Sequence, residues 1–450
     1  MKRFIQTIKN IWSIEDLRKR ILYTLGLVLI YRIGSFVVLP GVDPSQLSGL
    51  QKQGEEGLMG LLNMFSGGAF SNASIFALGI MPYITASIII QLFTMVIPKF
   101  QKLQRDGENG RKKMNQYTRF LTIIVCAFQA PAYITNMRTQ LGASSTAFYP
   151  FDGSAPTLFF WITSIIILIC GTLFVMWLGE RITEKGIGNG ISLLIMVGII
   201  ARLPFALIAE FGSRLNEGGG LVMFLLEIVV LLVVILLVIL LVQGTRRIPV
   251  QYAKRIVGNK QYGGVRQYIP IKVNAAGVMP IIFAQAIMFV PITIMGFSNN
   301  TDSKFWMAFA DFNGFWYNLV FAILVILFTF FYTAIAINPK QMADDMKKNG
   351  GFIPGVKPGK HTAEFLENIL SKITLPGSIF LAIVAILPAI IRLFGVNTQF
   401  AQFYGGTSLL ILVGVVLDTL QQIESHLLMR HYDGLTKTGR IKGRSSSMLG

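Results

Sequence analysis

Few side chains in this 450-residue sequence have the types and spacing that catalysis needs. The only histidines are His361, His426 and His431, and no second metal-ligand motif lies near any of them. The glycine-rich stretch 186–190 imitates a phosphate-binding loop, but the Lys-Ser/Thr pair of that motif is absent. Close helix packing through its glycines is the better interpretation. The sequence predicts that the chain is not an enzyme and has no metal site and no cofactor.

Ionisable residues inside apolar stretches would indicate an ion-coupled or proton-coupled transporter. The candidates are Arg32 and Glu227, toward the outer ends of their stretches, and Asp418, about midway along the last one. Arg32 can extend its charge to the membrane surface, and Asp418 can be capped or hydrogen-bonded to another helix. No chain of partners connects the three, so a secondary transporter remains an alternative that depends mainly on Asp418.

The elements that must position any site are apolar helices in a membrane. Hydrophobic residues make up 53% of the chain and charged residues 14%, and the mean hydropathy is +0.60. Runs of about 20 apolar residues, the length that crosses a bilayer as a helix, occur ten times. The predicted spans are Ile21–Leu39, Ala73–Ile97, Thr118–Thr135, Thr157–Leu178, Ile187–Ala209, Leu221–Val242, Asn274–Met295, Phe315–Ile337, Ile373–Ile391 and Thr407–Met429.

The basic residues predict the orientation of these spans. Most of the 40 Lys and Arg residues lie in the two terminal tails and in alternate loops, which places those loops and both termini in the cytoplasm. The net charge of +18 could indicate contact with nucleic acid, anionic lipids or acidic protein surfaces, of which lipid is the default, and the longer cytoplasmic loops suggest partners. Cys126 and Cys170 both lie in apolar spans and are expected to be core residues.

Five spans in each half mean that the second half enters the membrane inverted relative to the first, and inverted halves often enclose a central pathway. The predicted fold is an all-α membrane protein of two inverted five-helix halves. We expect an interfacial helix over 1–20 and spans one to five over 21–210, with a short segment at about 59–72 that cannot cross. An external hinge loop over 211–220 should lead to spans six to ten over 221–429. Residues 243–273 and 338–372 should form cytoplasmic loops, and residues 430–450 a basic cytoplasmic tail.

The two long cytoplasmic loops contain different structural signals. Alternating apolar residues on either side of Gly258 and Asn259 predict a projecting hairpin in the first loop. The second is expected to be helical over 341–348 and then to form a stiff tip, because Pro354 and Pro358 restrict the residues before them. That tip presents Lys357 and favours docking of a partner.

Several motifs are similar to those of the SecY family. They are NMFSGGAFSNASIFALGIMPYITASIIIQL from Asn63, GENGRKKMNQYTRF from Gly107, WLGERITEKGIGNGIS from Trp177, RRIPVQYAKR from Arg246, KVNAAGVMP from Lys272, FYTAIAINP from Phe331 and GGTSLLI from Gly405. Together they touch nearly every predicted span. The resemblance implies a clamshell of two halves with a lateral gate between spans two, three, seven and eight, and a passive channel for unfolded secretory proteins and membrane helices in the bacterial inner membrane.

The resemblance also assigns candidate residues. A ring of aliphatic side chains would close the pore, because an apolar constriction excludes water and ions; a plug would fill the external funnel; polar residues would hold the lateral gate; and basic residues would receive partners. These are Ile80, Ile84, Ile191, Ile195, Ile282 and Ile411 for the ring; Asn63, Phe65, Ser66, Gly67 and Gly68 for the plug; Thr85, Gln91 and Asn274 for the gate; and Arg246, Arg247, Lys254, Arg255 and Lys357 for docking.

By the same resemblance, the partners would be SecE and SecG, the motor ATPase SecA, the ribosome, secretory and membrane protein substrates, anionic lipids and accessory Sec and insertase proteins. The chain departs from the family pattern at two positions. Lys357 stands where the family usually has Arg, and Gln243 where it usually has an acidic residue, so the docking geometry differs. An insertase without a pore is a further alternative to the channel.

Overall fold

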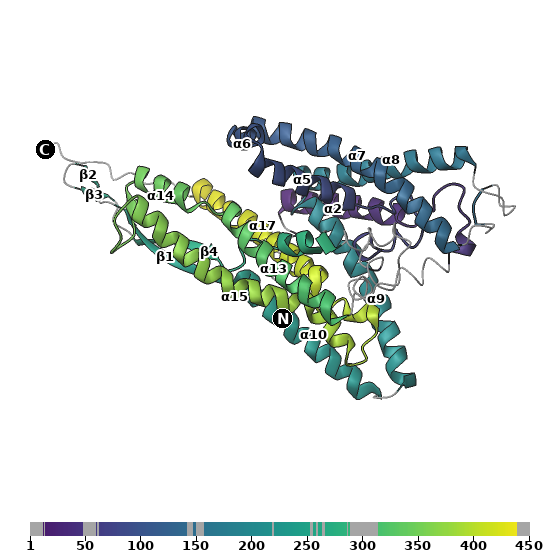
Figure 1. Ribbon diagram of the computed structural model, residues 1–450. Helices are drawn as coiled ribbons and strands as arrows, with labels where there is room; N and C mark the ends of the chain where they lie inside the picture. Colours follow the sequence, from purple (N-terminus) through teal and green to yellow (C-terminus); the bar gives the residue numbers. More distant parts are fainter. Residues whose placement is uncertain are drawn as a thin grey trace.

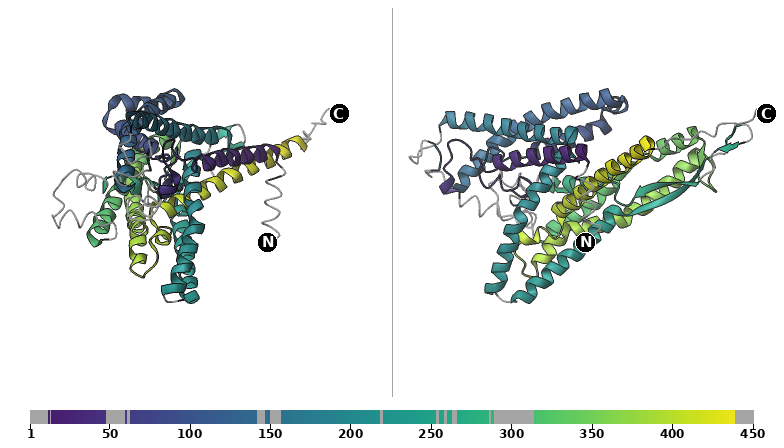
Figure 2. Two further views of the ribbon diagram at one scale, coloured as in Figure 1. Left: turned by 90° about the vertical axis from the view of Figure 1, so that its right-hand side faces the viewer. Right: turned by 180° about the vertical axis from the view of Figure 1, so that it is seen from behind.

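The computed structural model contains two groups of helices that are joined along one long helix. It describes residues 12, 14–47, 60, 63–141, 147–149, 157–217, 220–252, 255–257, 260–262, 266–285, 287–288 and 314–438. Figures 1 and 2 show the first half (purple to blue) and the second half (green to yellow) as separate bodies that diverge from a shared region. Helices α8 (Leu158–Lys185) and α10 (Gly220–Gln243), one from each group, are strongly apolar, which fits lipid as the surrounding solvent.

The first half is built from helices that pack side by side in chain order. Helix α7 packs on α5, α6 and α8, and α8 packs on α2 and α9. Helix α7 includes Pro131, and α8 is capped at its N-terminus by Thr157, whose hydroxyl accepts from the backbone N–H of Phe160. The bounds are α2 Glu15–Gly34, η1 Pro44–Gln46, α5 Met81–Val96, α6 Pro98–Arg105, α7 Gly107–Leu141, α8 Leu158–Lys185 and α9 Gly190–Glu217.

The second half contains the remaining helices and meets the first chiefly along α9. Helix α9 packs on α2 and α8 on one side and on α10, α16 and α17 on the other. Helices α13 and α15 form the most extensive helix pair of the second half. The bounds are α10 Gly220–Gln243, α13 Phe315–Ala336, α14 Pro339–Lys348, α15 Lys360–Arg392, α16 Thr398–Ala401 and α17 Gly406–Thr438.

The two long loops that were predicted to be cytoplasmic, 243–273 and 338–372, are joined in one small domain, here called the loop domain. Strands β1 (Thr245–Tyr252) and β4 (Arg266–Lys272) pair antiparallel, and β5 (Gly351–Phe352) of the second loop pairs with β1. Strands β2 (Arg255–Val257) and β3 (Lys260–Tyr262) form a separate ribbon. A cluster that includes Ile248, Met346, Ile353 and Leu366 packs this sheet against α14 and α15. The projecting hairpin and the helix near 341–348 are both confirmed.

The predicted first and second spans were wrong at their facing ends. Helix α2 stops at Gly34, and the following Val37–Leu39 stretch is extended; α5 begins at Met81, and residues 66–80 form turns. The two stretches hydrogen-bond to each other, since the N–H of Leu39 donates to the carbonyl of Ala73 at 2.8 Å and the N–H of Ile75 donates to Val37 at 3.0 Å. Non-helical backbone is tolerated at membrane depth where protein surrounds it, so apolar character alone misled the prediction.

Within the described residues, seven helices are long and apolar enough to cross a membrane, and α5 with α6, bent by 103°, would make an eighth. The ten predicted crossings are consistent with this count. Helix α2 has charged residues in its first and last turns, and the predicted seventh span begins with turns at 273–278 and lies partly outside the described residues. Other predicted boundaries also move: α2 begins at Glu15 rather than at residue 21, α9 leaves a shorter hinge, and α17 extends to Thr438.

Candidate functional site: the junction between the two halves

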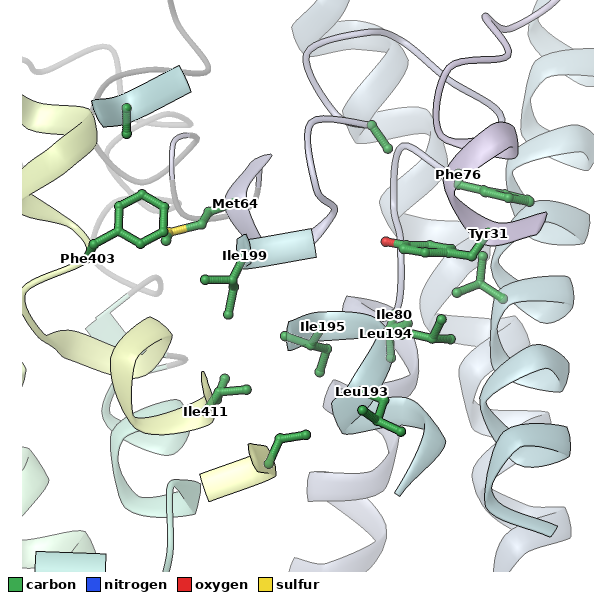
Figure 3. Packing of buried hydrophobic residues seen from close by; sticks show 14 of the residues in the cluster. Tyr31, Met64, Phe76, Ile80, Leu193, Leu194, Ile195, Ile199, Phe403 and Ile411 are labelled. Atoms are coloured by element: carbon green, nitrogen blue, oxygen red, sulfur yellow. The ribbon is translucent and has the colours of Figure 1, made fainter. Parts of the chain in front are cut away.

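Isoleucines from both halves meet at this junction. Ile80 lies at the N-terminus of α5, Ile195 on α9 and Ile411 on α17; all three are buried in one apolar cluster, with exposures of 5%, 7% and 7%. Ile84 and Ile191 are partly buried against it. Because Ile80 and Ile84, like Ile191 and Ile195, are four residues apart, each pair lies on one face of its helix. Figure 3 shows Ile80, Ile195 and Ile411 converging from three elements.

Ile282, the sixth predicted member, does not belong to this cluster. It is only partly buried, while its neighbours Ile281 and Ala284 are buried in the core of the second half. The helical turns that carry it begin near Met279, and the burial of its neighbours fixes the face that turns inward. The structure therefore brings together five of the six predicted ring residues.

The predicted plug residues form a compact turn beside the isoleucine cluster. Asn63 and Ser66 are buried, and the Asn63 Oδ1 accepts from the N–H of Ser71 at 3.1 Å. The Ser66 hydroxyl donates to the carbonyl of Asn63 and accepts from the N–H of Phe70. Phe65 packs against the cluster from a partly buried position. These internal hydrogen bonds satisfy a non-helical backbone in an apolar setting.

Two glycines allow this turn to approach α9. Gly67 and Gly68 have φ values of +65° and +94°, which residues with a side chain rarely adopt. A Cβ on Gly67 would lie 2.8 Å from the Cα of Gly198 on α9. A Cβ on Gly198 would lie 3.1 Å from the backbone nitrogen of Gly67 and from the carbonyl oxygen of Phe65. The turn and α9 therefore touch backbone to backbone.

The same turn also contacts the second half. Met64, which is 2% exposed, directs its side chain toward Phe403, as Figure 3 shows. The hydroxyl of Ser408, at the start of α17, donates to Met64 Sδ at 3.1 Å. Thioether sulfur is a weak acceptor, so this is a weak bond. The turn thus lies between the two halves, above the isoleucines.

The three predicted gate residues are not brought together. The Thr85 hydroxyl donates to the carbonyl of Met81 within its own helix, at 3.0 Å. Gln91 instead meets Tyr332 of α13, whose hydroxyl donates to Gln91 Oε1 at 3.4 Å. Asn274 is buried, and its Oδ1 has no hydrogen-bond partner among the described residues. A single polar contact therefore crosses from α5 to the second half here.

Tyr332 is a gate contact that sequence reasoning did not select. Its ring lies 6.3 Å from that of Phe283, which stacks on Phe328 at 5.7 Å. The available signal was a hydroxyl-bearing aromatic in an otherwise apolar span, since a buried Tyr hydroxyl normally has a hydrogen-bond partner. The sequence did not indicate which partner that would be.

The predicted docking residues that the structure describes lie on the loop domain formed by 243–273 and 338–372. Arg246 and Arg247 are exposed on β1, and Lys357 is exposed on the tip after β5. The carbonyl of Lys357 accepts from the hydroxyl of Thr362, which fixes the tip to the start of α15. Arg255 lies on β2, and Lys254 falls outside the described residues. Pairing of β1 with β5 holds the two loops together as one surface.

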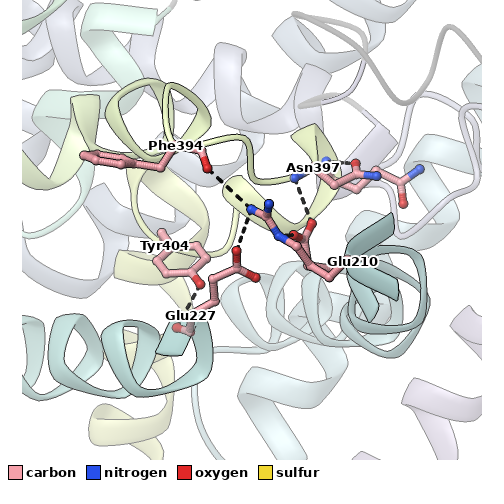
Figure 4. Close-up of polar contacts among 7 residues, drawn as sticks. Glu210, Glu227, Phe394, Asn397 and Tyr404 are labelled. Carbon is pink, nitrogen blue, oxygen red and sulfur yellow. Dashed lines mark hydrogen bonds and ion pairs between the residues drawn. The ribbon is translucent and has the colours of Figure 1, made fainter. Parts of the chain in front are cut away.

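A buried ion cluster connects the C-terminal end of α9 to α10, and it was not predicted from the sequence. Arg214 lies between two carboxylates: its Nε is 2.9 Å from Glu210 Oε1, and its Nη2 is 2.6 Å from Glu227 Oε1 on α10. Glu210 also accepts from the N–H of Asn397 at 2.7 Å, so the loop between α15 and α16 joins the cluster. Figure 4 shows these contacts together with Tyr404, whose hydroxyl donates to the Glu227 carbonyl.

The residues that kept the transporter alternative open are now placed separately. Glu227 belongs to the ion cluster, Arg32 donates to the plug turn, and Asp418 is exposed on α17. The three thus lie in unconnected settings, whereas a coupled relay needs ionisable groups in contact along a pathway. No group of three or more His, Cys, Asp or Glu side chains in the described part of the chain could hold a metal ion.

The sequence is similar to a family of known proteins. The sequence profile of the SecY family matches residues 74–420. The chain is 45% identical to the protein translocase subunit SecY of Streptomyces scabiei, with 94% of this chain and 97% of that protein covered. It is 42% identical to the subunit of the same name from Thermus thermophilus, with 97% and 100% covered.

Solved structures share the fold. A structure described as that of a protein-conducting channel superimposes with a TM-score of 0.62, at 19% identity and with 93% of this chain and 95% of that chain covered. A second, described as a study of the plug domain that stabilises the closed state of the SecY channel, has a TM-score of 0.59 at 18% identity and the same coverage. Because the family profile matches most of the chain, and relatives named SecY are 42–45% identical over nearly its whole length, the chain belongs to the SecY family.

Proposed function

We propose that this chain is the central channel subunit of a Sec translocase, a passive conduit for unfolded secretory proteins that also releases membrane helices sideways into lipid. The observation that carries the proposal is the apolar cluster of Ile80, Ile84, Ile191, Ile195 and Ile411, built from both halves and covered by the turn at 63–70. An apolar constriction excludes water and ions, and its side chains can still yield to a passing chain.

In this proposal, residues 63–70 are the plug and Ile282 joins the ring when the halves move. The contact from Tyr332 to Gln91 closes the lateral gate. Thr85, which bonds within its own helix, and the buried Asn274 would line the gate without bonding across it in this arrangement. Such interhelical bonds are worth about 0.6 kcal/mol on average in membranes, so a hydrophobic signal can separate them. A segment with ten leucines gains about 5 kcal/mol on entering lipid at about 0.5 kcal/mol per residue, which exceeds a few such bonds.

The energy for transport comes from partners, because the chain itself supplies a path rather than a catalytic site. SecA and the translating ribosome would dock on Arg246, Arg247, Lys254, Arg255 and Lys357, with SecE and SecG bound in the membrane. One structural neighbour is described as the Sec61 channel in a ribosome-channel complex, which supports a ribosome as one such partner. The chain would reside in the bacterial inner membrane with both termini in the cytoplasm, as its basic loops predict.

Photocrosslinking tests the pore assignment directly. A photoreactive residue is placed at Ile195 or Ile411, and a secretory chain is stalled during translocation. Both positions should crosslink the stalled chain, while the same residue at Leu232, which is 55% exposed on α10, should not. Absence of crosslinks at both isoleucines, with cargo still exported, would exclude this cluster as the path. A third probe at Ile282 tests whether that residue lines the open pore.

A further inference from the structure

Arg32 has a definite partner. It lies in the last turn of α2, and its Nη1 donates to the carbonyl of Gly67 in the plug turn at 2.6 Å. The guanidinium also lies 4.8 Å from the centre of the Phe36 ring. A permanently charged side chain in an apolar span is costly, and its position near the span end would allow it to reach the interface instead. Here the charge is directed to a plug carbonyl.

Other side chains of the first half hold the neighbouring plug carbonyls. The hydroxyl of Tyr31 donates to the carbonyl of Ser66 at 3.3 Å, and the hydroxyl of Tyr133 on α7 donates to that of Phe70 at 2.8 Å. The contact from the second half, Ser408 to Met64 Sδ, uses a weak acceptor. The side-chain donors to these three carbonyls therefore come from α2 and α7, and the bonds from Arg32 and Tyr133 are the short ones.

We propose that Arg32 is the latch of the plug, a positioning residue that holds the closed position by donating to the carbonyl of Gly67. This inference rests on the proposed function, in which residues 63–70 are the plug. The bond to a guanidinium is stronger than a bond between neutral groups. It is made here with Gly67 at positive φ and packed against Gly198. Loss of the bond should favour the released plug.

The proposal differs from a purely structural role for Arg32. An arginine that only anchors α2 at the interface would affect insertion or stability, but it would leave the plug as protected as before. A latch affects the exposure of the plug itself. The readout must therefore be the accessibility of a plug residue, measured on a folded channel complex without any cargo.

The reporter is Ser71, which directly follows the plug turn, is 5% exposed and donates its N–H to Asn63 Oδ1 of that turn, so release of the plug should expose it. Ser71→Cys is introduced after Cys126 and Cys170 have been replaced by alanine, and the assembled complex in sealed membranes is labelled from outside with a charged maleimide. Arg32→Met should increase the labelling rate about tenfold, the factor that a strong hydrogen bond corresponds to. Tyr31→Phe, which removes one hydroxyl, should increase it several-fold.

Arg138→Met is the matched control, since it removes an arginine from the last turn of α7 and should leave the labelling rate unchanged. An unchanged rate in Arg32→Met would overturn the latch. If Arg32→Met is not recovered as a folded complex, Arg32→Gln decides, since it removes the charge and shortens the side chain, and an unchanged rate there overturns the proposal. Labelling needs no translocation, so failure of the latch is distinguishable from failure of the proposed function, which would appear as absent export in the parent protein.

Discussion

At the scale of single residues, the constriction depends on which isoleucines are buried together. Ile195 is 7% exposed inside the cluster, whereas Ile282 is only partly buried outside it. Exchange for asparagine places an amide where water was excluded. The two positions therefore test whether sealing follows the observed packing or the family pattern.

We expect Ile195→Asn to increase resting ion conductance more than Ile282→Asn does. A loss of about 1.4 kcal/mol from the closed state raises a minor open population roughly tenfold. Conductance of the reconstituted complex measures the leak, and export of a reporter with a shortened signal measures discrimination. Equal leaks from both variants would mean that Ile282 seals as well as Ile195, and no leak from Ile195→Asn would remove it from the ring.

Substitution of the two plug glycines distinguishes backbone strain at positive φ from the steric clash of an added Cβ. Gly67→Ala and Gly68→Ala should each destabilise the closed plug by about 1–2 kcal/mol, because both residues have positive φ. Only the Gly67 variant also places a Cβ against Gly198, since no heavy atom lies within 4 Å of the position on Gly68. Gly67→Ala should therefore leak more in the conductance assay. A larger leak from Gly68→Ala would contradict the close packing of plug and α9.

The family resemblance, not residue type or spacing, selected the six ring positions, and the structure gathers five of them in one cluster. Helical spacing explains only why a pair such as Ile191 and Ile195 shares a helix face. The contacts of Arg32 and Tyr332 were not predictable in this way. Arg32 meets Gly67, and Tyr332 meets Gln91 from 241 residues away, only after the chain has folded. A sequence reveals that a polar group in a span needs a partner, but not which one.

At the scale of elements, α9 joins the halves and is fastened at both ends. At its beginning, the N–H of Gly188 donates to Gln422 of α17 at 2.8 Å; at its end, Arg214 connects α9 to α10 through Glu227. The sequence predicted a glycine-rich hinge at 211–220, but helix continues through much of it. The three glycines suggested a flexible backbone, whereas the buried ion pairs of Arg214 restrict movement of α9 relative to α10.

Removal of Arg214 should destabilise this joint. Arg214→Met leaves two buried carboxylates without their cation, which costs about 3–5 kcal/mol when a buried pair is broken. Arg119→Met is the control, since it breaks the ion pair with Glu180, in which the arginine side chain is 48% exposed. An exposed ion pair contributes about 0–1 kcal/mol to stability. The thermal midpoint of the purified complex measures both. Equal shifts in the two variants would argue against the cluster as a fastening of α9.

The loop domain is one structural element made from two loops. The tip is supported by the pairing of β1 with β5 and by the apolar cluster that includes Ile353. Lys357 is exposed, so its ammonium group does not contribute to this support. Lys357→Glu should therefore leave the thermal midpoint unchanged but strongly reduce SecA-driven translocation, because it presents the wrong charge. Arg138→Glu makes the same charge change at the far end of α7 and should translocate normally. Normal transport by Lys357→Glu would exclude the tip from docking.

At the scale of the whole molecule, opening must separate the halves, and the plug contacts both. Its carbonyls accept from α2 and α7 of the first half, while Met64 meets Ser408 and Phe403 of the second. Separation should break the weaker set, so the plug should remain with the first half. The sequence predicted two halves from the parity of the spans, but this asymmetry requires the coordinates.

Engineered disulfides test which half keeps the plug. Met64→Cys with Ser408→Cys joins the plug to the second half, at a site where the native side chains are 3.1 Å apart. Val38→Cys with Ser74→Cys joins the end of the plug segment to the first half, across an antiparallel bridge whose spacing suits a disulfide. The first pair should block translocation until it is reduced, because it holds the halves together, and the second pair should transport normally in both states. Transport through the oxidised Met64–Ser408 pair, with crosslinking complete, would mean that the plug can leave the first half during opening.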